Sequence, residues 1–172
     1  MVQEIASALT VKGMQSFVNA HSWVWPVCEM THYVGMSLIM GIIGVLDLRV
    51  LGLFRRIPAG ALRPLVPIAI VGFIFNLLTG IVFVTGTGSG AVFYVDNLSF
   101  QLKMLCVVLA GANLLYFRYS GIEEATYALP AGAQAQPKAK AIALTSLVLW
   151  LFIIFFGRML MYNDTLLLFL GL

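Results

Sequence analysis

Four long apolar segments decide what this chain can fold into. They cover about residues 24–46, 65–84, 100–117 and 141–161, and each is long enough to cross about 30 Å of hydrocarbon as a helix. The composition agrees, because 61% of the residues are hydrophobic and 10% are charged, whereas a soluble domain has about 25% charged residues. The sequence therefore predicts an all-α fold in which four transmembrane helices form a bundle, with residues 1–172 as one domain.

Two segments outside the spans have their own predictions. Residues 1–20 lack the continuous apolar core of a span, and their spaced apolar residues favour a helix lying in the membrane interface. These apolar residues are Ile5, Leu9, Val11 and Phe17. The segment of about residues 120–139 contains PAGAQAQP, whose two prolines disfavour a helix, and it is predicted to be a flexible linker.

The basic residues predict the orientation in the membrane. They gather in the loop between the first two spans and in the loop before the fourth span, as Arg49, Arg55, Arg56, Arg63, Arg118, Lys138 and Lys140. The loop between the second and third spans, TGTGSGAVFYVDN, contains neither lysine nor arginine. By the positive-inside rule the basic loops face the cytoplasm, so both termini are predicted on the opposite, periplasmic side. Loops of this kind specify topology and do not indicate a nucleic-acid partner.

Four ionisable residues fall in the outer halves of the predicted spans. Glu29 and His32 belong to the first span, Lys103 to the third and Arg158 to the fourth. An ionisable side chain at the bilayer centre costs at least about 2.5–3.5 kcal/mol, so pairing of Glu29 with Lys103 or Arg158 is one explanation. Five glycines in the first two spans are expected to let helices approach closely. They are Gly35, Gly41, Gly44, Gly72 and Gly80.

A cofactor site is the other explanation for these residues. His32 is the candidate ligand, because imidazole binds haem iron, copper and zinc. Glu29 would orient His32 or move a proton, while Lys103 and Arg158 would neutralise haem propionates or another anion. His21 lies about 16 Å from His32 along the same helix, too far to share one metal.

A second ligand for iron or copper would come from another span, a partner chain or a bound molecule. The internal candidates are methionines near the outer ends of the third and fourth spans, with Met159 as the predicted metal ligand beside His32. The other two are Met104 and Met161.

Four short motifs follow one another along residues 21–118. They are W-P-x-x-E-x-x-H at 25–32, D-L-R-x-L-G at 47–52, N-x-x-F-x-x-K at 97–103 and A-G-x-N at 110–113. Together they resemble a family of small bacterial inner-membrane proteins that has only a domain-of-unknown-function label. Its architecture is similar to that of copper-resistance D type membrane proteins and, more loosely, of small b-type cytochromes.

The resemblance implies a multi-pass protein of the bacterial inner membrane with four helices, and it implies no established activity. Its pattern positions in this chain are Glu29, His32, Asp47, Arg49, Asn97, Lys103 and Asn113. Asp47 lies at the cytoplasmic end of the first span, where it is expected to pair with Arg55 or Arg63, or else to serve a proton role beside a quinone.

Two functions remain open from the sequence. The first is a redox or electron-transfer component that binds haem b or copper at His32. The second is a cofactor-free accessory subunit that packs against a larger respiratory or photosynthetic complex, or against a second copy of the chain, within the lipid bilayer. The apolar tail TLLLFLGL favours such a partner. Transport is weaker because no inverted repeat is visible. Hydrolase motifs such as G-x-S-x-G are absent, so an enzyme acting alone is not predicted.

Overall fold

The computed structural model describes residues 12–86 and 91–171, and this part of the chain contains helices and turns without a strand. Four helical segments are long and apolar enough to cross a membrane. Their main helices are α3 (Val24–Leu51), α4 (Val66–Gly86), α6 (Leu98–Tyr119) and α8 (Pro137–Met159). The predicted all-α class and the four apolar helices are thus confirmed. The predicted interfacial segment falls partly on residues 1–11, which lie outside the described residues.

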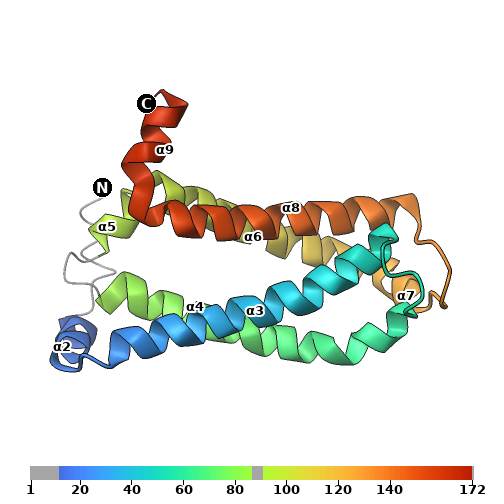
Figure 1. The fold of residues 1–172 in the computed structure, drawn as a ribbon, viewed down its shortest axis with the longest axis horizontal. Coiled ribbons are helices and arrows are strands. Elements are labelled where there is room, and N and C mark those ends of the chain that lie inside the picture. Colours follow the sequence, from blue (N-terminus) through green and yellow to red (C-terminus); the bar gives the residue numbers. More distant parts are fainter. Residues whose placement is uncertain (1–11, 87–90, 172) are drawn as a thin grey trace.

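The long helices form two antiparallel hairpins that lie one against the other (Figure 1). One hairpin is α3 with α4, the other is α6 with α8, and α3 also contacts α8. The hairpins diverge towards the end that bears the short helices α2 (Lys12–Ala20) and α9 (Asn163–Leu170). The two hairpins therefore meet chiefly through α3 and α8.

Local sequence signals set the ends of these helices. Gly52 follows α3 with a φ of 108°, in the left-handed region that glycine adopts without strain, and its N–H donates to the carbonyl of Leu48. Asn97 caps α6 by accepting the N–H of Phe100 at 3.1 Å. Pro137 opens α8 in the first turn, where its missing N–H costs nothing.

The loop between α6 and α8 is more ordered than the sequence predicts. It contains the short helix α7 (Ile122–Tyr127), and α8 begins before the predicted residue 141. The N–H of Gly132 donates to the carbonyl of Arg55 at 2.7 Å, and the N–H of Ala59 donates to that of Leu129 at 3.1 Å. The loops of the two hairpins are therefore joined, because their backbone groups bond to each other.

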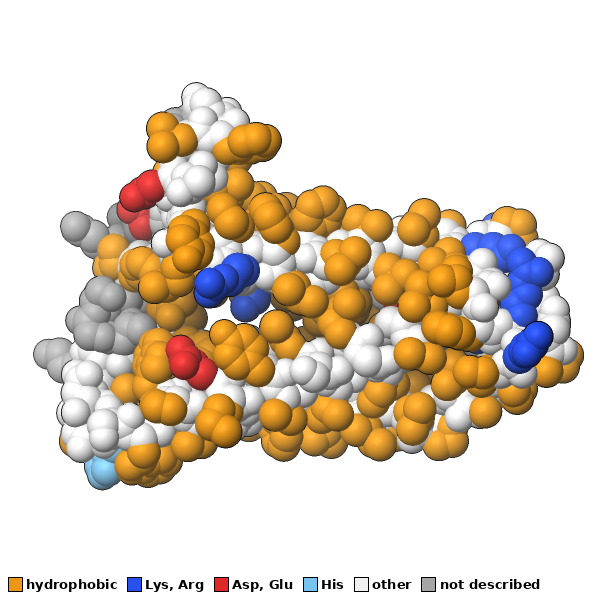
Figure 2. All heavy atoms as spheres, in the orientation of Figure 1, with side chains coloured by type: hydrophobic (Ala, Val, Ile, Leu, Met, Phe, Trp, Pro, Cys, Tyr) orange, Lys and Arg blue, Asp and Glu red, His pale blue; other side chains and the backbone are white. Residues whose placement is uncertain are grey.

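The 3₁₀ helix η1 (Ala59–Leu65) leads from this junction into α4. Seven of the ten lysines and arginines belong to the loops and helix ends on this side, which carries the basic surface of Figure 2. We call it the basic end of the bundle.

Short elements occupy the opposite end of the bundle. They are α2, α5 (Val92–Val95), η2 (Leu160–Tyr162) and α9. Helix α2 packs on α4, where Val18 is buried beside Gly86. Helix α9 turns away from the bundle (Figure 1) and leaves Leu168 and Phe169 80% and 86% exposed.

Candidate functional site

His32 lies on α3 where this helix faces α4. Its Nδ1 is 2.7 Å from Oγ1 of Thr79, and the Thr79 hydroxyl donates to the carbonyl of Phe75 at 2.6 Å. A hydroxyl has one hydrogen, so the bond from Thr79 to Phe75 is compatible with the imidazole tautomer that carries its proton on Nδ1 and donates to Thr79. In that tautomer the Nε2 lone pair is free to bind iron or another metal.

Lys103 of α6 comes close to this imidazole. Its ammonium is near enough to act on His32 electrostatically, although it comes from the other hairpin. The lysine side chain runs over Gly157 of α8, with Nζ 3.7 Å from the point where a Cβ would stand. Among the described residues Lys103 forms no hydrogen bond or ion pair, so its charge is available to an anion.

Glu29 and Arg158 are both exposed, and they do not pair with each other or with Lys103. The indole N–H of Trp25 donates to Glu29 at 3.0 Å, and the guanidinium of Arg158 lies 5.6 Å from the ring centre of Tyr162. Within the described part of the chain, the ion pair that forms is Arg63 with Glu124 at the basic end. The pairing predicted for Glu29 is therefore absent, because a partner one helical turn away takes its carboxylate.

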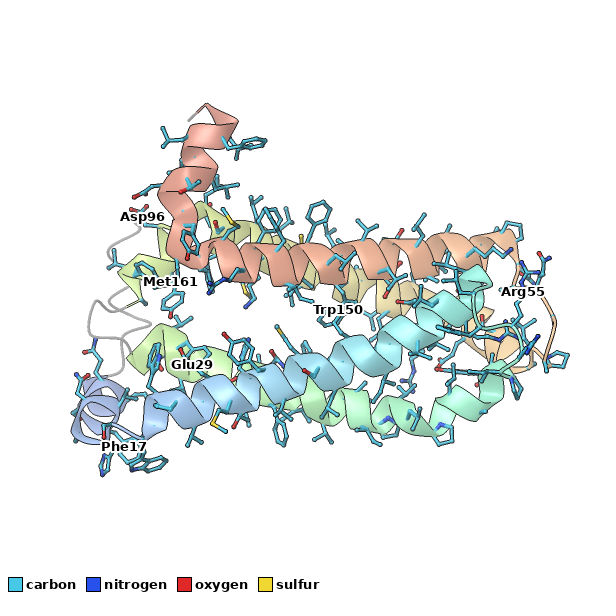
Figure 3. All side chains as sticks on the ribbon, in the orientation of Figure 1. Phe17, Glu29, Arg55, Asp96, Trp150 and Met161 are labelled. Carbon is cyan, nitrogen blue, oxygen red and sulfur yellow. The ribbon has the colours of Figure 1, made fainter. Side chains whose placement is uncertain are left out.

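These side chains border a hollow between the two hairpins. Figure 2 shows Lys and Arg atoms on the α8 side of the hollow and Asp and Glu atoms on the α3 side. Figure 3 shows Glu29 on the side of α3 that faces this hollow. The arrangement brings the predicted residues to one level of the bundle but leaves their charges apart. We call this region the His32 cleft.

The methionines add little to the His32 cleft. Met159 ends α8 and its carbonyl accepts a hydrogen bond from Ser99 at 3.3 Å, while Met104 and Met161 are 43% and 75% exposed. In residues 12–86 and 91–171 no three His, Cys, Asp or Glu side chains gather into a group that could hold a metal ion. Haem supplies four nitrogen ligands of its own and needs one imidazole from the protein.

Most of the other motif residues hold the fold together. Arg49 is fully buried, and its guanidinium donates to the carbonyls of Ile57, Pro130 and Ala133. Asn97 donates from Nδ2 to the carbonyl of Leu160 at 3.0 Å. Asn113 donates to the carbonyl of Ile142 at 3.1 Å. These bonds fix the loops and the α6–α8 hairpin, so they explain three motif positions without a ligand.

A second candidate site lies in the half of the bundle nearer the basic end. It is a cavity of about 440 Å³ between the hairpins, with walls from all four long helices. We call it the Asp47 chamber. Its polar wall residues are Asp47, Asn113, Arg118, Glu123, Tyr127 and Ser146. Tyr127 lies outside the spans, where burial, and after it the neighbouring Glu123, raises the pKa of its phenol.

Asp47 does not form the ion pair predicted for it. Arg55 donates instead to the carbonyl of Gly52 at 3.0 Å, and Arg63 pairs with Glu124. Asp47 is 7% exposed, and its buried Oδ2 has no hydrogen-bond partner among the residues that the structure describes. The sequence marks Asp47 as unusual but gives no sign of Ser146 or Tyr127, which reach the chamber from distant segments.

Comparison with known proteins assigns the chain to no family. No protein-family profile, no curated protein and no solved structure matches the chain. The fold and the composition therefore define its class, which is a helical membrane protein with four candidate spans. The resemblance to the small inner-membrane family stays a prediction.

Proposed function

We propose that this protein is an electron-transfer component of the bacterial inner membrane that holds a b-type haem at His32. The observation that carries the proposal is the chain from His32 through Thr79 to the carbonyl of Phe75, which fixes the imidazole and leaves Nε2 free. Hydrogen bonding at the opposite ring nitrogen is what ligating histidines use to set their orientation and basicity. Haem b, when bound, supplies reversible one-electron chemistry.

The charges of the His32 cleft support haem over a bare metal ion. Lys103 has no anionic partner among the described residues, and Arg158 contacts only an aromatic ring in this region. Two cations without an anionic partner on neighbouring helices, Lys103 and Arg158, suit the two carboxylates of a haem, because charge-assisted bonds are about twice as strong as neutral ones. Glu29, held by Trp25, would accept a proton at the mouth of the cleft.

We expect haem spectra to distinguish the role of His32, the iron ligand, from that of Thr79, which orients it. The purified protein, titrated with haemin and then reduced with dithionite, should show a low- or high-spin b-type spectrum. His32→Ala should abolish it, because the iron loses its protein ligand. Thr79→Val should keep the spectrum but weaken haem affinity by about 10–100-fold, the usual cost of removing a bond behind a ligating histidine.

His21→Ala is the matched control for this experiment. His21 is exposed and follows α2, where its ring bonds to the carbonyl of Phe17, so its loss should leave the spectrum unchanged. A wild-type protein that binds no haemin, or spectra that His32→Ala and His21→Ala weaken equally, would contradict the proposal.

The orientation in the membrane has its own test. We expect the basic end to face the cytoplasm, so in a variant without Cys28 and Cys106 a cysteine at Arg56 should be shielded in intact cells. A cysteine at Asp96, on the opposite end, should react with a membrane-impermeant maleimide. Both side chains are exposed, so accessibility to the reagent depends on the side of the membrane alone. The reverse labelling pattern would put the His32 cleft on the cytoplasmic side.

Helix α9 favours a second candidate function, that of an accessory subunit. It projects from the bundle and exposes Leu168 and Phe169 almost completely (Figure 1). Such a helix suits packing against a second membrane chain, because its exposed apolar side chains would then be buried between the two chains. A photo-crosslinking residue at Phe169 should give a discrete protein adduct in native membranes, with the same residue at Phe152 of α8 as control. Lipid adducts alone at Phe169 would contradict this candidate.

A further inference from the structure

We propose that the Asp47 chamber is a binding site for a lipid-soluble molecule whose head carries an O–H or N–H donor, received by the Asp47 carboxylate. This site is independent of His32, because none of the wall residues of the chamber belongs to the His32 cleft. The proposal assigns a ligand class to the inner half of the bundle.

The carboxylate of Asp47 is the first observation. It lines the chamber from α3, is 7% exposed and has one oxygen without a hydrogen-bond partner. Ser146 of α8 lines the same chamber. Nine in ten or more buried polar groups in proteins are paired, so a buried orphan oxygen needs an explanation. A donor from outside the chain provides one.

The charges on the chamber wall limit which kinds of ligand head group the chamber can bind. Asp47 and Glu123 are acidic, and Arg118 is the basic residue among the described wall residues. Arg49 is close in sequence but does not neutralise Asp47, because its guanidinium is occupied by three backbone carbonyls. A carboxylate or phosphate head would meet a net negative wall. A hydroxyl or ammonium head would find an acceptor.

The body of the chamber suits an apolar molecule. Its volume of about 440 Å³ falls in the range of about 300–1,000 Å³ typical of small-molecule sites. Its walls are mostly aliphatic and aromatic, and they include Ile43, Phe73 and Leu114. Leu114 of α6 both lines the chamber and is 60% exposed within an apolar span, so we expect the entrance there. A ligand that enters there comes from the lipid phase.

Trp150 gives the chamber an internal reporter. It lies on its wall, and Figure 3 places it between the two hairpins. The chain has three tryptophans, so a variant with Trp23→Phe and Trp25→Phe reports from Trp150 alone. We would measure Kd in detergent micelles from Trp150 fluorescence with three probes: 4-decylphenol, its methyl ether and decylamine.

We expect the phenol or the amine to bind about tenfold or more tightly than the ether, because only the ether lacks a donor for Asp47. Asp47→Ala should remove this preference and still fold, since within the described residues Asp47 takes part in no ion pair that the substitution would break. Asp96→Ala, which removes an exposed carboxylate at the other end, should keep the preference. His32→Ala should also keep it.

The probes also show which kind of head group supplies the hydrogen-bond donor. A tighter amine indicates a cationic head, and a tighter phenol indicates a neutral hydroxyl head such as that of a quinol. Equal affinity for all three probes, or a preference that survives in Asp47→Ala, would overturn the proposal. Loss of haem binding in His32→Ala with intact probe binding would separate this site from the proposed function.

Discussion

Replacement of Arg49 by alanine is expected to lower the free energy of unfolding by about 3 kcal/mol or more, because three buried carbonyls lose their donor at once. Arg49 is fully buried and binds Ile57 in one interhelical loop and Pro130 and Ala133 in the other. The guanidinium provides five donors in a planar fork, and its charge is compensated by carbonyl dipoles. Its removal leaves these groups unpaired and weakens a junction that two backbone hydrogen bonds between the loops still hold.

Thermal unfolding in detergent micelles would measure this effect. Arg49→Lys should fall between wild type and Arg49→Ala, because a single ammonium cannot reproduce the fork geometry. Arg56→Ala is the control, since Arg56 is exposed in the same loop and should change stability by less than about 0.5 kcal/mol. Equal melting temperatures for Arg49→Ala and Arg56→Ala would show that the bonds of Arg49 do not hold the loops.

The same residue explains why the chamber depends on the loops. Arg49 lies two positions after Asp47, and the segments that it binds lead into η1 and α8. If this junction loosens, the ends of α3 and α8 lose a shared anchor, and the chamber walls that these two helices provide move apart. We therefore expect Arg49→Ala to weaken the probe preference as well as the fold.

Hydropathy predicts the four spans well, and their ends less well. The first span is predicted to end near residue 46, whereas α3 continues to Leu51. The reason is that Asp47 and Arg49 read as polar residues outside the membrane, although both side chains are buried in the bundle. The true end is set by Gly52, whose positive φ is a local signal that hydropathy ignores.

The candidate site shows the limit of sequence reasoning more clearly. An ionisable residue in a span predicts a site at His32, but its partner Thr79 is 47 residues away and depends on how α3 and α4 align. The partner of Glu29 is Trp25, four residues earlier, a spacing at which helical side chains are neighbours. That contact was accessible to sequence reasoning. The chamber was not, because a cavity depends on how two hairpins diverge.

Gly35→Ala is the second substitution with a large expected effect. A Cβ at Gly35 would stand 2.6 Å from the carbonyl oxygen of Gly72 and closer still to Nδ2 of Asn76. Real Cβ atoms essentially never come so near backbone, so α3 and α4 would have to separate. Of the five glycines expected to allow close helix approach, Gly35 and Gly72 do so, whereas the expectation is wrong for Gly41 and Gly80, which have no atom within 4 Å of an added Cβ.

Two opposing free energies decide whether Gly35→Ala stabilises or destabilises the fold. Alanine is favoured over glycine in a helix by about 1 kcal/mol, whereas forcing an extra carbon into a packed interface costs about 1–3 kcal/mol or more. Because the added Cβ would meet backbone atoms, we expect the cost of the clash to exceed the gain in helix propensity. Gly35→Ala should therefore unfold at a lower temperature in micelles. Gly41→Ala, on the same helix with no atom within 4 Å of its Cβ, should be neutral or stabilising.

The position of Gly35 links this stability test to the proposed site. His32 lies three residues before Gly35 on α3, and Thr79 lies three residues after Asn76 on α4, so the imidazole bond crosses the same interface. Separation of the two helices lengthens the contact from His32 to Thr79 and frees the imidazole to rotate. Gly35→Ala should therefore weaken haemin binding as Thr79→Val does, while Gly41→Ala binds it like wild type. Unchanged haem affinity in Gly35→Ala despite a lower melting temperature would mean that the orientation of His32 does not depend on α4.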